Sequence, residues 1–197
     1  MRLVNVRHLL HRGTFASSVE ATRIDTDIQN GIQRVCWPAG SGSFTLLNTP
    51  DGNGVKPIKN DFIAHLQEQG WQVEQRMRIA SRIRPGKVDA VHRLQDGRHF
   101  AVEWETGNIS SSHRALNKMA VGLLDGCLAG GALVLPSRQM YTYLTDRTGN
   151  YSEIEPYFPM WESLVVEGVL SVYVVEYDAL SSTAPAIPKG TDGRALR

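Results

Sequence analysis

Apolar and polar positions along the chain follow two different periods, which predict its secondary structure. Residues 71–79 alternate between apolar and charged or amide side chains, as expected for a half-buried strand. Residues 58–69 instead repeat apolar positions at helical spacing and end at Gly70, which predicts a helix. The same periods predict strands over 87–94, 98–105, 132–135 and 170–177, and helices over 112–128 and from about 137. This order indicates one α/β domain with a central mixed β-sheet flanked by helices.

Three segments carry weaker patterns. Residues 1–35 show no consistent period, so we assign no element to them. Residues 36–54 are rich in Gly, Ser, Asn and Pro around a short apolar run at 44–47, which predicts a loop, a strand and a second loop. Residues 151–161 are rich in aromatic side chains and are expected to form a loop.

The length of 197 residues suits one domain with a sizeable core and is short for two. The last segment, residues 181–197, is rich in Ser, Thr, Ala, Pro and Gly and is expected to be a loose tail. We therefore expect a single domain over residues 1–180, with its core over about 55–178.

The composition excludes several classes of protein. Hydrophobic residues make up 42% and charged residues 21%, which is typical of globular rather than disordered proteins. The two cysteines, Cys36 and Cys127, cannot build a disulfide framework or a four-cysteine zinc site. No apolar stretch reaches membrane-spanning length, and the first residues lack a signal-peptide pattern. We expect a cytoplasmic protein that does not associate with membranes.

The charges are balanced in number but unevenly placed. The 21 basic and 20 acidic residues leave a net charge of +1, which excludes a wholly basic, histone-like protein. However, residues 76–87 contain five basic side chains and no acid, namely Arg76, Arg78, Arg82, Arg84 and Lys87. Residues 141–180 contain seven acids and one base. A basic run of this kind is either a solvated face or a surface for a polyanion such as DNA.

A carboxylate pair follows the basic run. Side chains on a strand alternate between faces, so Glu103 and Glu105 share a face that is opposite to Trp104. Two neighbouring carboxylates repel each other unless a cation neutralises them. Such a pair is either a solvated surface feature or part of a metal site.

The turn at residues 95–97 decides where Asp89 lies relative to this pair. A two-residue turn would place Asp89 opposite Trp104, on the wrong face. A three-residue loop with Gly97 in the left-handed region pairs residue 94 with residue 98 and places Asp89 opposite Glu103. We prefer the longer loop because it yields one apolar face, to which His92 contributes as a structural residue. It also places Lys87 opposite Glu105.

The three-residue loop therefore predicts a carboxylate trio of Asp89, Glu103 and Glu105 at one end of the hairpin. Such a group of oxygen ligands suits a hard divalent cation such as Mg²⁺.

The spacing of the acidic residues resembles the PD-(D/E)XK nuclease core. In this chain, thirteen residues separate Asp89 from Glu103-Trp104-Glu105, and a helix is predicted to follow. More closely, this pattern resembles the BamHI/BglII branch of type II restriction endonucleases, in which the usual lysine of the motif is replaced, by Glu in the BamHI-like case. Glu105 stands at that position. The resemblance covers roughly residues 55–178 and implies a restriction-endonuclease-like core. Two departures from the common motif are that Val88 rather than proline precedes Asp89, and that the lysine is absent.

The resemblance implies a role for each acidic residue of the motif. Asp89 and Glu103 would be the metal-binding carboxylates. Glu105 would help to bind a second metal or activate the attacking water. Glu74, on the preceding strand, would be either an additional acid near the metals or a surface glutamate. Lys87 or Lys118 would supply the positive charge of the missing lysine, contact phosphate or simply be solvated.

The resemblance also implies contacts with DNA. The basic run from Arg76 to Lys87 would hold phosphates. The loop and helix start after the motif approach DNA in this family, and there Asn108, Ser112 and Arg114 are suited to base edges or phosphates. Ser111 or Ser112 is alternatively the N-cap of the helix.

The function that the resemblance implies is Mg²⁺-dependent hydrolysis of phosphodiester bonds in double-stranded DNA, with one or two ions per site. It also implies a homodimer, formed through the helix after the motif or through residues 151–161, and a cognate DNA methyltransferase in the same system. Two alternatives remain: a repair or junction-resolving nuclease, and a DNA-binding module that no longer cleaves. The first expectation is a type II restriction enzyme.

Overall fold

A six-stranded mixed sheet forms the centre of the computed structural model, which describes residues 1–55, 58–79, 86–145 and 148–189. The strand order is β1-β7-β6-β5-β4-β3, in which β5, β6 and β7 are mutually parallel and the other neighbours are antiparallel. The strands are β1 (Arg2–Arg12), β3 (Gln72–Met77), β4 (Gly86–Arg93), β5 (His99–Trp104), β6 (Leu128–Pro136) and β7 (Gly168–Glu176). The predicted mixed α/β architecture is confirmed.

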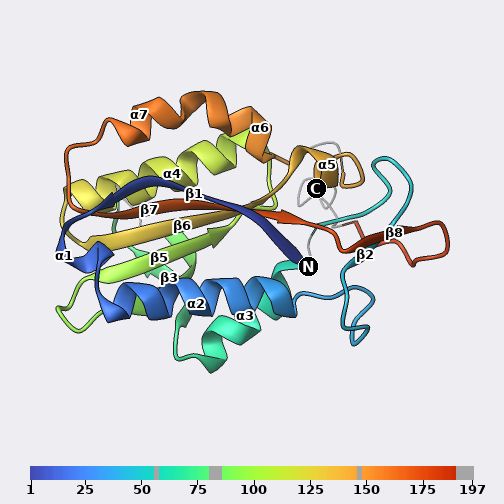
Figure 1. Ribbon diagram of the computed structural model, residues 1–197, viewed down its shortest axis with the longest axis horizontal. Helices are drawn as coiled ribbons and strands as arrows, with labels where there is room; N and C mark the ends of the chain where they lie inside the picture. Colours follow the sequence, from blue (N-terminus) through green and yellow to red (C-terminus); the bar gives the residue numbers. More distant parts are fainter. Residues whose placement is uncertain (56–57, 80–85, 146–147, 190–197) are drawn as a thin grey trace, which may run out of the picture.

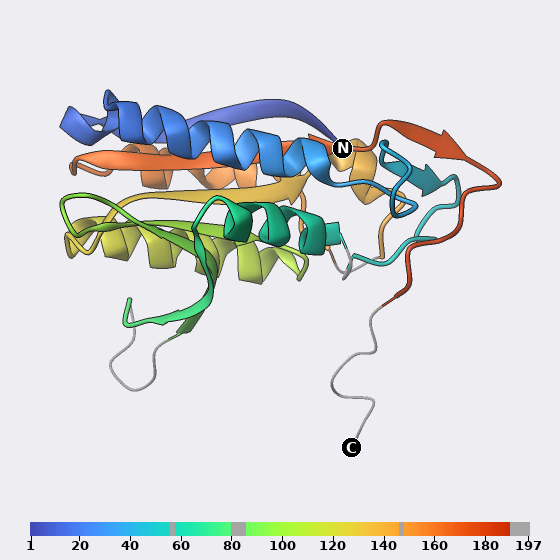
Figure 2. The same cartoon turned by 90° about the horizontal axis from the view of Figure 1, so that it is seen from below.

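Helices cover both faces of this sheet (Figure 1). One layer holds α2 (Val19–Arg34) and α3 (Ile58–Glu68), and the other holds α4 (Ile109–Leu124), α6 (Tyr151–Ile154) and α7 (Phe158–Glu162). The shorter elements are α1 (Gly13–Ala16), α5 (Arg138–Tyr141), a 3-10 turn at Glu155–Tyr157, and a small parallel pair of β2 (Thr45–Leu47) with β8 (Ala179–Ser181). This pair lies beyond one end of the main sheet (Figure 2).

The two central parallel strands, β6 and β7, are buried at every position. Strands covered on both faces are expected to be continuously apolar rather than alternating. The predicted strand at 132–135 is therefore too short, because the glycines that precede it also belong to β6. At Gly131 an added Cβ would lie 2.4 Å from Met119 Sδ, so α4 packs directly on the bare backbone there.

Helix α4 begins and ends earlier than its pattern predicts. It covers Ile109–Leu124 instead of 112–128, and Gly126 adopts a positive φ of 70° just beyond it. A glycine in this conformation ends a helix at no steric cost.

The hairpin of β4 and β5 has the predicted three-residue loop. Leu94 N–H donates to Arg98 O at 2.9 Å, and Gly97 has a φ of 87°. Ala90 pairs with Val102 and His92 with Phe100, which confirms the register. The ring of His92 lies 5.2 Å from that of Trp71, in agreement with its expected structural role.

Two segments in which no helix or strand was predicted form regular structure. Residues 1–35 supply β1 and α2, and the β1–β7 pairing shifts register at Val4 and at Leu9. These irregularities explain why the strand shows no clean period two. The expected loop over 151–161 is wrong: it forms α6, the 3-10 turn and α7, and α6 begins with a capping box between Asn150 and Glu153.

The beginning of the C-terminal segment is attached to the domain rather than loose. Ile187 is buried, its N–H donates to Asn53 Oδ1 at 3.3 Å, and its carbonyl accepts from Gly54 N–H at 2.8 Å. The expectation of a loose tail therefore fails as far as residue 189, and residues 190–197 lie outside the described residues. In the described part of the chain, no helix combines the length and apolarity needed to cross a membrane.

Candidate active site

Asp89 and Glu103 lie where β4 and β5 stop pairing. Trp104 N–H donates to Asp89 Oδ2 at 2.9 Å, and Asp89 N–H donates to Glu103 Oε2 at 3.3 Å. Beyond the pair of Ala90 with Val102, side-chain oxygens thus take the place of backbone carbonyls. This exchange orients the two carboxylates on neighbouring strands, as the predicted register requires.

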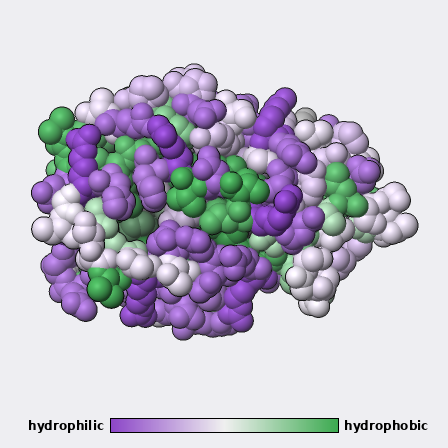
Figure 3. Space-filling view, viewed as in Figure 1, coloured by the Kyte–Doolittle hydropathy of each residue, from purple (hydrophilic) through white to green (hydrophobic). Residues whose placement is uncertain are grey.

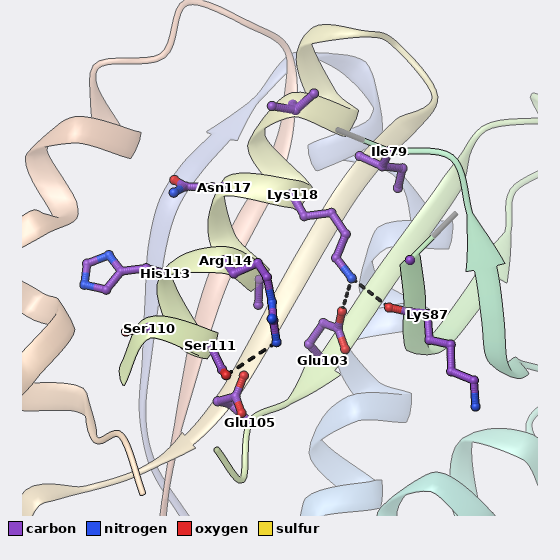
Figure 4. A pocket seen from close by; sticks show the side chains of 13 residues that line it. Ile79, Lys87, Glu103, Glu105, Ser110, Ser111, His113, Arg114, Asn117 and Lys118 are labelled. Carbon is purple, nitrogen blue, oxygen red and sulfur yellow. Dashed lines mark hydrogen bonds and ion pairs between the residues drawn. The ribbon is translucent and has the colours of Figure 1, made fainter. Parts of the chain in front are cut away.

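The second oxygen of each carboxylate accepts a hydrogen bond from a lysine ammonium. Lys59, on α3, donates from Nζ to Asp89 Oδ1 at 2.8 Å. Lys118, on α4, donates to Glu103 Oε1 at 2.5 Å and to the carbonyl oxygen of Lys87 at 2.8 Å. Figure 4 shows the Lys118 side chain reaching Glu103. One lysine therefore comes from each of the two helical layers.

Burial shifts the pKa values of groups in both ion pairs. Burial raises the pKa of the Glu103 carboxyl, although the charge of Lys118 opposes this effect. For Lys59, burial alone would lower the pKa, but the hydrogen bond and the charge of Asp89 more than compensate, so the pKa is raised. The ammonium of Lys59 is thus held in its charged form beside Asp89.

Glu105 points toward the start of α4 instead of joining the other two carboxylates. Its Oε1 accepts from Gly107 N–H at 2.6 Å, and burial raises the pKa of its carboxyl. Among the described residues, no three metal-ligating side chains are arranged closely enough to hold an ion. The predicted trio is therefore a pair of Asp89 and Glu103, with Glu105 on the wall of the same cleft.

Glu74 does not join the carboxylate pair either. It has a φ of 52° and makes no pair in the β3–β4 ladder, although the register is the same on both sides of it. Its Oε2 lies 2.7 Å from Lys87 Nζ, and the side chains are 49% and 57% exposed. Lys87, predicted to lie opposite Glu105, is thus paired with Glu74 at the surface.

The cleft beside the carboxylate pair has a volume of about 790 Å³ and lies between α4 and the ends of β4 and β5. The predicted site residues on its wall are Lys87, Glu103, Glu105, Arg114 and Lys118, joined by Ser110 and Ser111. On this wall, Arg114 donates to the hydroxyl of Ser111, three residues earlier on the same helix, at 3.4 Å (Figure 4).

The other described residues that were predicted to contact DNA do not line this cleft. Arg76 and Arg78 are exposed at the end of β3, outside the lining of this cleft. Ser112, which the sequence analysis expected to contact DNA, is instead fully buried. Arg82 and Arg84 lie outside the described residues.

Asn108 is the N-cap of α4, a role that the sequence analysis assigned to Ser111 or Ser112. Its side chain accepts from Ser111 N–H at 3.3 Å. We expect Asn108→Ala to lower the free energy of unfolding by about 1 kcal/mol, because the N–H of Ser111 loses its side-chain acceptor and keeps only the carbonyl oxygen of residue 108. Urea denaturation measures the effect. Asn108→Asp keeps an acceptor and is the control; an equal loss in both variants would contradict the capping role.

Sequence reasoning missed Lys59. Its neighbours show only an amphipathic helix, and a lysine at the start of such a helix is ordinarily solvated. Only the packing of α3 beside β4 brings its ammonium to Asp89, thirty residues later in the chain. No local signal in the sequence could have indicated this contact.

Comparisons with known proteins identify the family of this chain. A family model described as "Restriction endonuclease BamHI" matches residues 1–194. The chain is 46% identical over 198 residues to the type II restriction enzyme OkrAI of Oceanobacter kriegii, with 100% of both chains covered. It is 34% identical over 179 residues to the type II restriction enzyme BamHI of Bacillus amyloliquefaciens, covering 87% of this chain and 82% of that enzyme.

The fold is similar to that in a crystal structure of the restriction endonuclease BglII complexed with a DNA 16-mer. The TM-score is 0.64 at 8% identity, with 90% of this chain and 79% of that chain covered. These findings favour a restriction enzyme over a repair nuclease or an inactive module. The chain belongs to the BamHI family of restriction endonucleases and is a type II restriction enzyme, a site-specific deoxyribonuclease.

Proposed function

We propose that this enzyme hydrolyses phosphodiester bonds of double-stranded DNA with Mg²⁺ held by Asp89 and Glu103. The observation that carries the proposal is the shared arrangement of the two carboxylates. In each, one oxygen is anchored by a backbone N–H and the other is paired with a lysine ammonium. Each carboxylate thus already binds a positively charged group, and carboxylate oxygens are the ligands that a hard divalent cation prefers.

The residues around the pair would divide the work. A bound divalent cation of this kind polarises the phosphate and lowers the pKa of water. Asp89 and Glu103 would hold it in the orientation that their backbone hydrogen bonds impose. Oε1 of Glu105 accepts a hydrogen bond from Gly107 N–H. Its other oxygen, Oε2, would accept a proton from the attacking water. The raised pKa of its carboxyl makes it a stronger base than an exposed glutamate.

Basic side chains on and near the cleft would bind the DNA backbone. Arg114 and Lys118 lie on one face of α4 and line the cleft, with Lys87 on its opposite wall. Charged groups in this arrangement neutralise phosphates without reading the base sequence. Arg76 and Arg78 would extend the same surface along β3.

A homodimer would present two such sites to the two DNA strands. Its support is a group of exposed apolar side chains near α4 and α7: Leu124, Tyr157, Met160 and Val165 are all more than half exposed. Figure 3, seen from the same side as Figure 1, shows several separate apolar patches, one of them at the end of the molecule nearest α7. We further propose a cytoplasmic location and a cognate DNA methyltransferase that protects the host's own sites.

Digestion of a plasmid tests metal dependence and strand cleavage together. With Mg²⁺ we expect discrete linear fragments, since a dimer cuts both strands in one encounter. An excess of EDTA should stop the reaction, and renewed Mg²⁺ should restore it. Cleavage that continues in EDTA would contradict the metal site, and accumulation of nicked circles would contradict the dimer.

A further inference from the structure

The two lysines at the carboxylate pair occupy the oxygens that a metal ion would need. Glu103 Oε2 is taken by Asp89 N–H and Asp89 Oδ2 by Trp104 N–H. The remaining oxygens, Glu103 Oε1 and Asp89 Oδ1, are those paired with ammonium groups. Each oxygen can accept from more than one partner, so the lysines do not block a cation coordinated by both residues. They oppose it because like charges repel at this distance.

Lys118 is the more confined of the two. Its side chain and that of Glu103 are each 16% exposed, whereas Lys59 is 29% exposed. Lys118 also donates to the carbonyl oxygen of Lys87, which ties α4 to the start of β4. An ion pair of this burial is much less screened by salt than a surface pair such as Lys87 with Glu74.

We propose that Lys118 is a built-in counter-cation of the metal site: it neutralises Glu103 in the metal-free enzyme and leaves Oε1 when a divalent cation binds. The inference rests on the proposed metal role of Asp89 and Glu103. It makes Lys118 a positioning residue, because its hydrogen bonds to Glu103 and to the carbonyl oxygen of Lys87 hold the carboxylate in place before the ion arrives. It also makes Lys118 a competitor that weakens metal binding in the absence of DNA.

The released ammonium has a destination within the same cleft. Lys118 lies one helical turn after Arg114, and both line the cleft proposed for DNA. A phosphate of the DNA backbone in this cleft would form an ion pair with the ammonium of Lys118 after it leaves Glu103. Metal and DNA would then favour each other's binding, because both stabilise the same released state of Lys118.

Binding of Mn²⁺ to the DNA-free protein tests this exchange without any activity readout. The electron paramagnetic resonance signal of free Mn²⁺ reports the amount bound. We expect Lys118→Met, which keeps the aliphatic stem but removes the charge, to bind Mn²⁺ about tenfold more tightly than the wild type. Lys87→Met makes the same charge change on the same cleft and is the matched control; we expect it to alter the affinity less than about threefold.

Separate outcomes distinguish this inference from the proposed metal site. Glu103→Gln should lose the Mn²⁺ site, and wild-type affinity in that variant would overturn the metal site itself. If Glu103→Gln loses Mn²⁺ but folded Lys118→Met binds it no better than the wild type, only the role of Lys118 is overturned.

A measurement on the wild-type protein applies even if Lys118→Met does not fold. Nuclear magnetic resonance of ¹³C-labelled lysine side chains can follow the Lys118 Cε signal while Mg²⁺ is added. We expect this signal to move toward that of a solvated lysine as the metal site fills. A Lys118 signal that stays unchanged at saturating Mg²⁺ would overturn the exchange.

Discussion

Replacement of Asp89 or Glu103 by alanine is expected to lower the rate of DNA cleavage by at least about 100-fold. Each substitution removes an oxygen donor that the backbone holds in place through Trp104 N–H or Asp89 N–H. Each also leaves a lysine ammonium without its carboxylate partner, so the ion pair is replaced by a single positive charge. A divalent cation would then lose a ligand and meet electrostatic repulsion.

Single-turnover cleavage of a short duplex that contains the recognition site measures this effect. Asp96→Ala is the matched control, because Asp96 is an exposed carboxylate in the turn of the same hairpin, paired with Arg98. Its rate should stay close to that of the wild type. Circular dichroism verifies that the variants fold. Cleavage by folded Asp89→Ala within about threefold of the wild type would refute the assignment of the site.

The second large effect concerns Phe62 of α3, which is fully buried against α2 and the sheet. We expect Phe62→Ala to lower the free energy of unfolding by about 3–5 kcal/mol. Its ring lies 4.8 Å from that of Trp104, and an added Cβ at Gly31 of α2 would lie 2.9 Å from it. The cavity left by the ring would have bulky, well-packed neighbours that cannot collapse into it.

Urea denaturation followed by tryptophan fluorescence measures this loss of stability. Ile63→Ala, at the next and only partly buried position of α3, is the control and should cost clearly less. Because α3 also carries Lys59, Phe62→Ala should in addition loosen the contact with Asp89. A loss below about 1 kcal/mol would show that Phe62 does not hold α3 in place.

Elements defined by local patterns were predicted well. Helix α3 matches its predicted range to within one residue, and β3 and β7 lie inside or close to the predicted strands. Two of the failures share a cause, since they involve segments whose order depends on distant partners. β1 is held by β7 at the other end of the chain, and the segment up to Ile187 is held by Asn53 and Gly54.

The candidate site divides in the same way. Asp89, Glu103 and their relative placement were predictable, because a three-residue loop with Gly97 determines the register of a hairpin over a few residues. The direction of Glu105 was not, because it depends on the N–H of Gly107 in the following loop. Nor was the burial of Ser112, because it depends on the distant segment that packs on the start of α4, where an added Cβ at Gly149 would lie 3.1 Å from Ser112 Oγ.

The sequence by itself therefore determined the central hairpin, its paired carboxylates and the α/β class, all of which follow from periodicity and a short turn. Only the tertiary structure decided that Lys59 and Lys118 neutralise these carboxylates, from positions 30 and 15 residues away in the chain. The physical reason is that periodicity specifies which face of a helix is buried. Which polar side chain then meets a given carboxylate depends on how the helices dock on the sheet, through contacts between residues far apart in the chain.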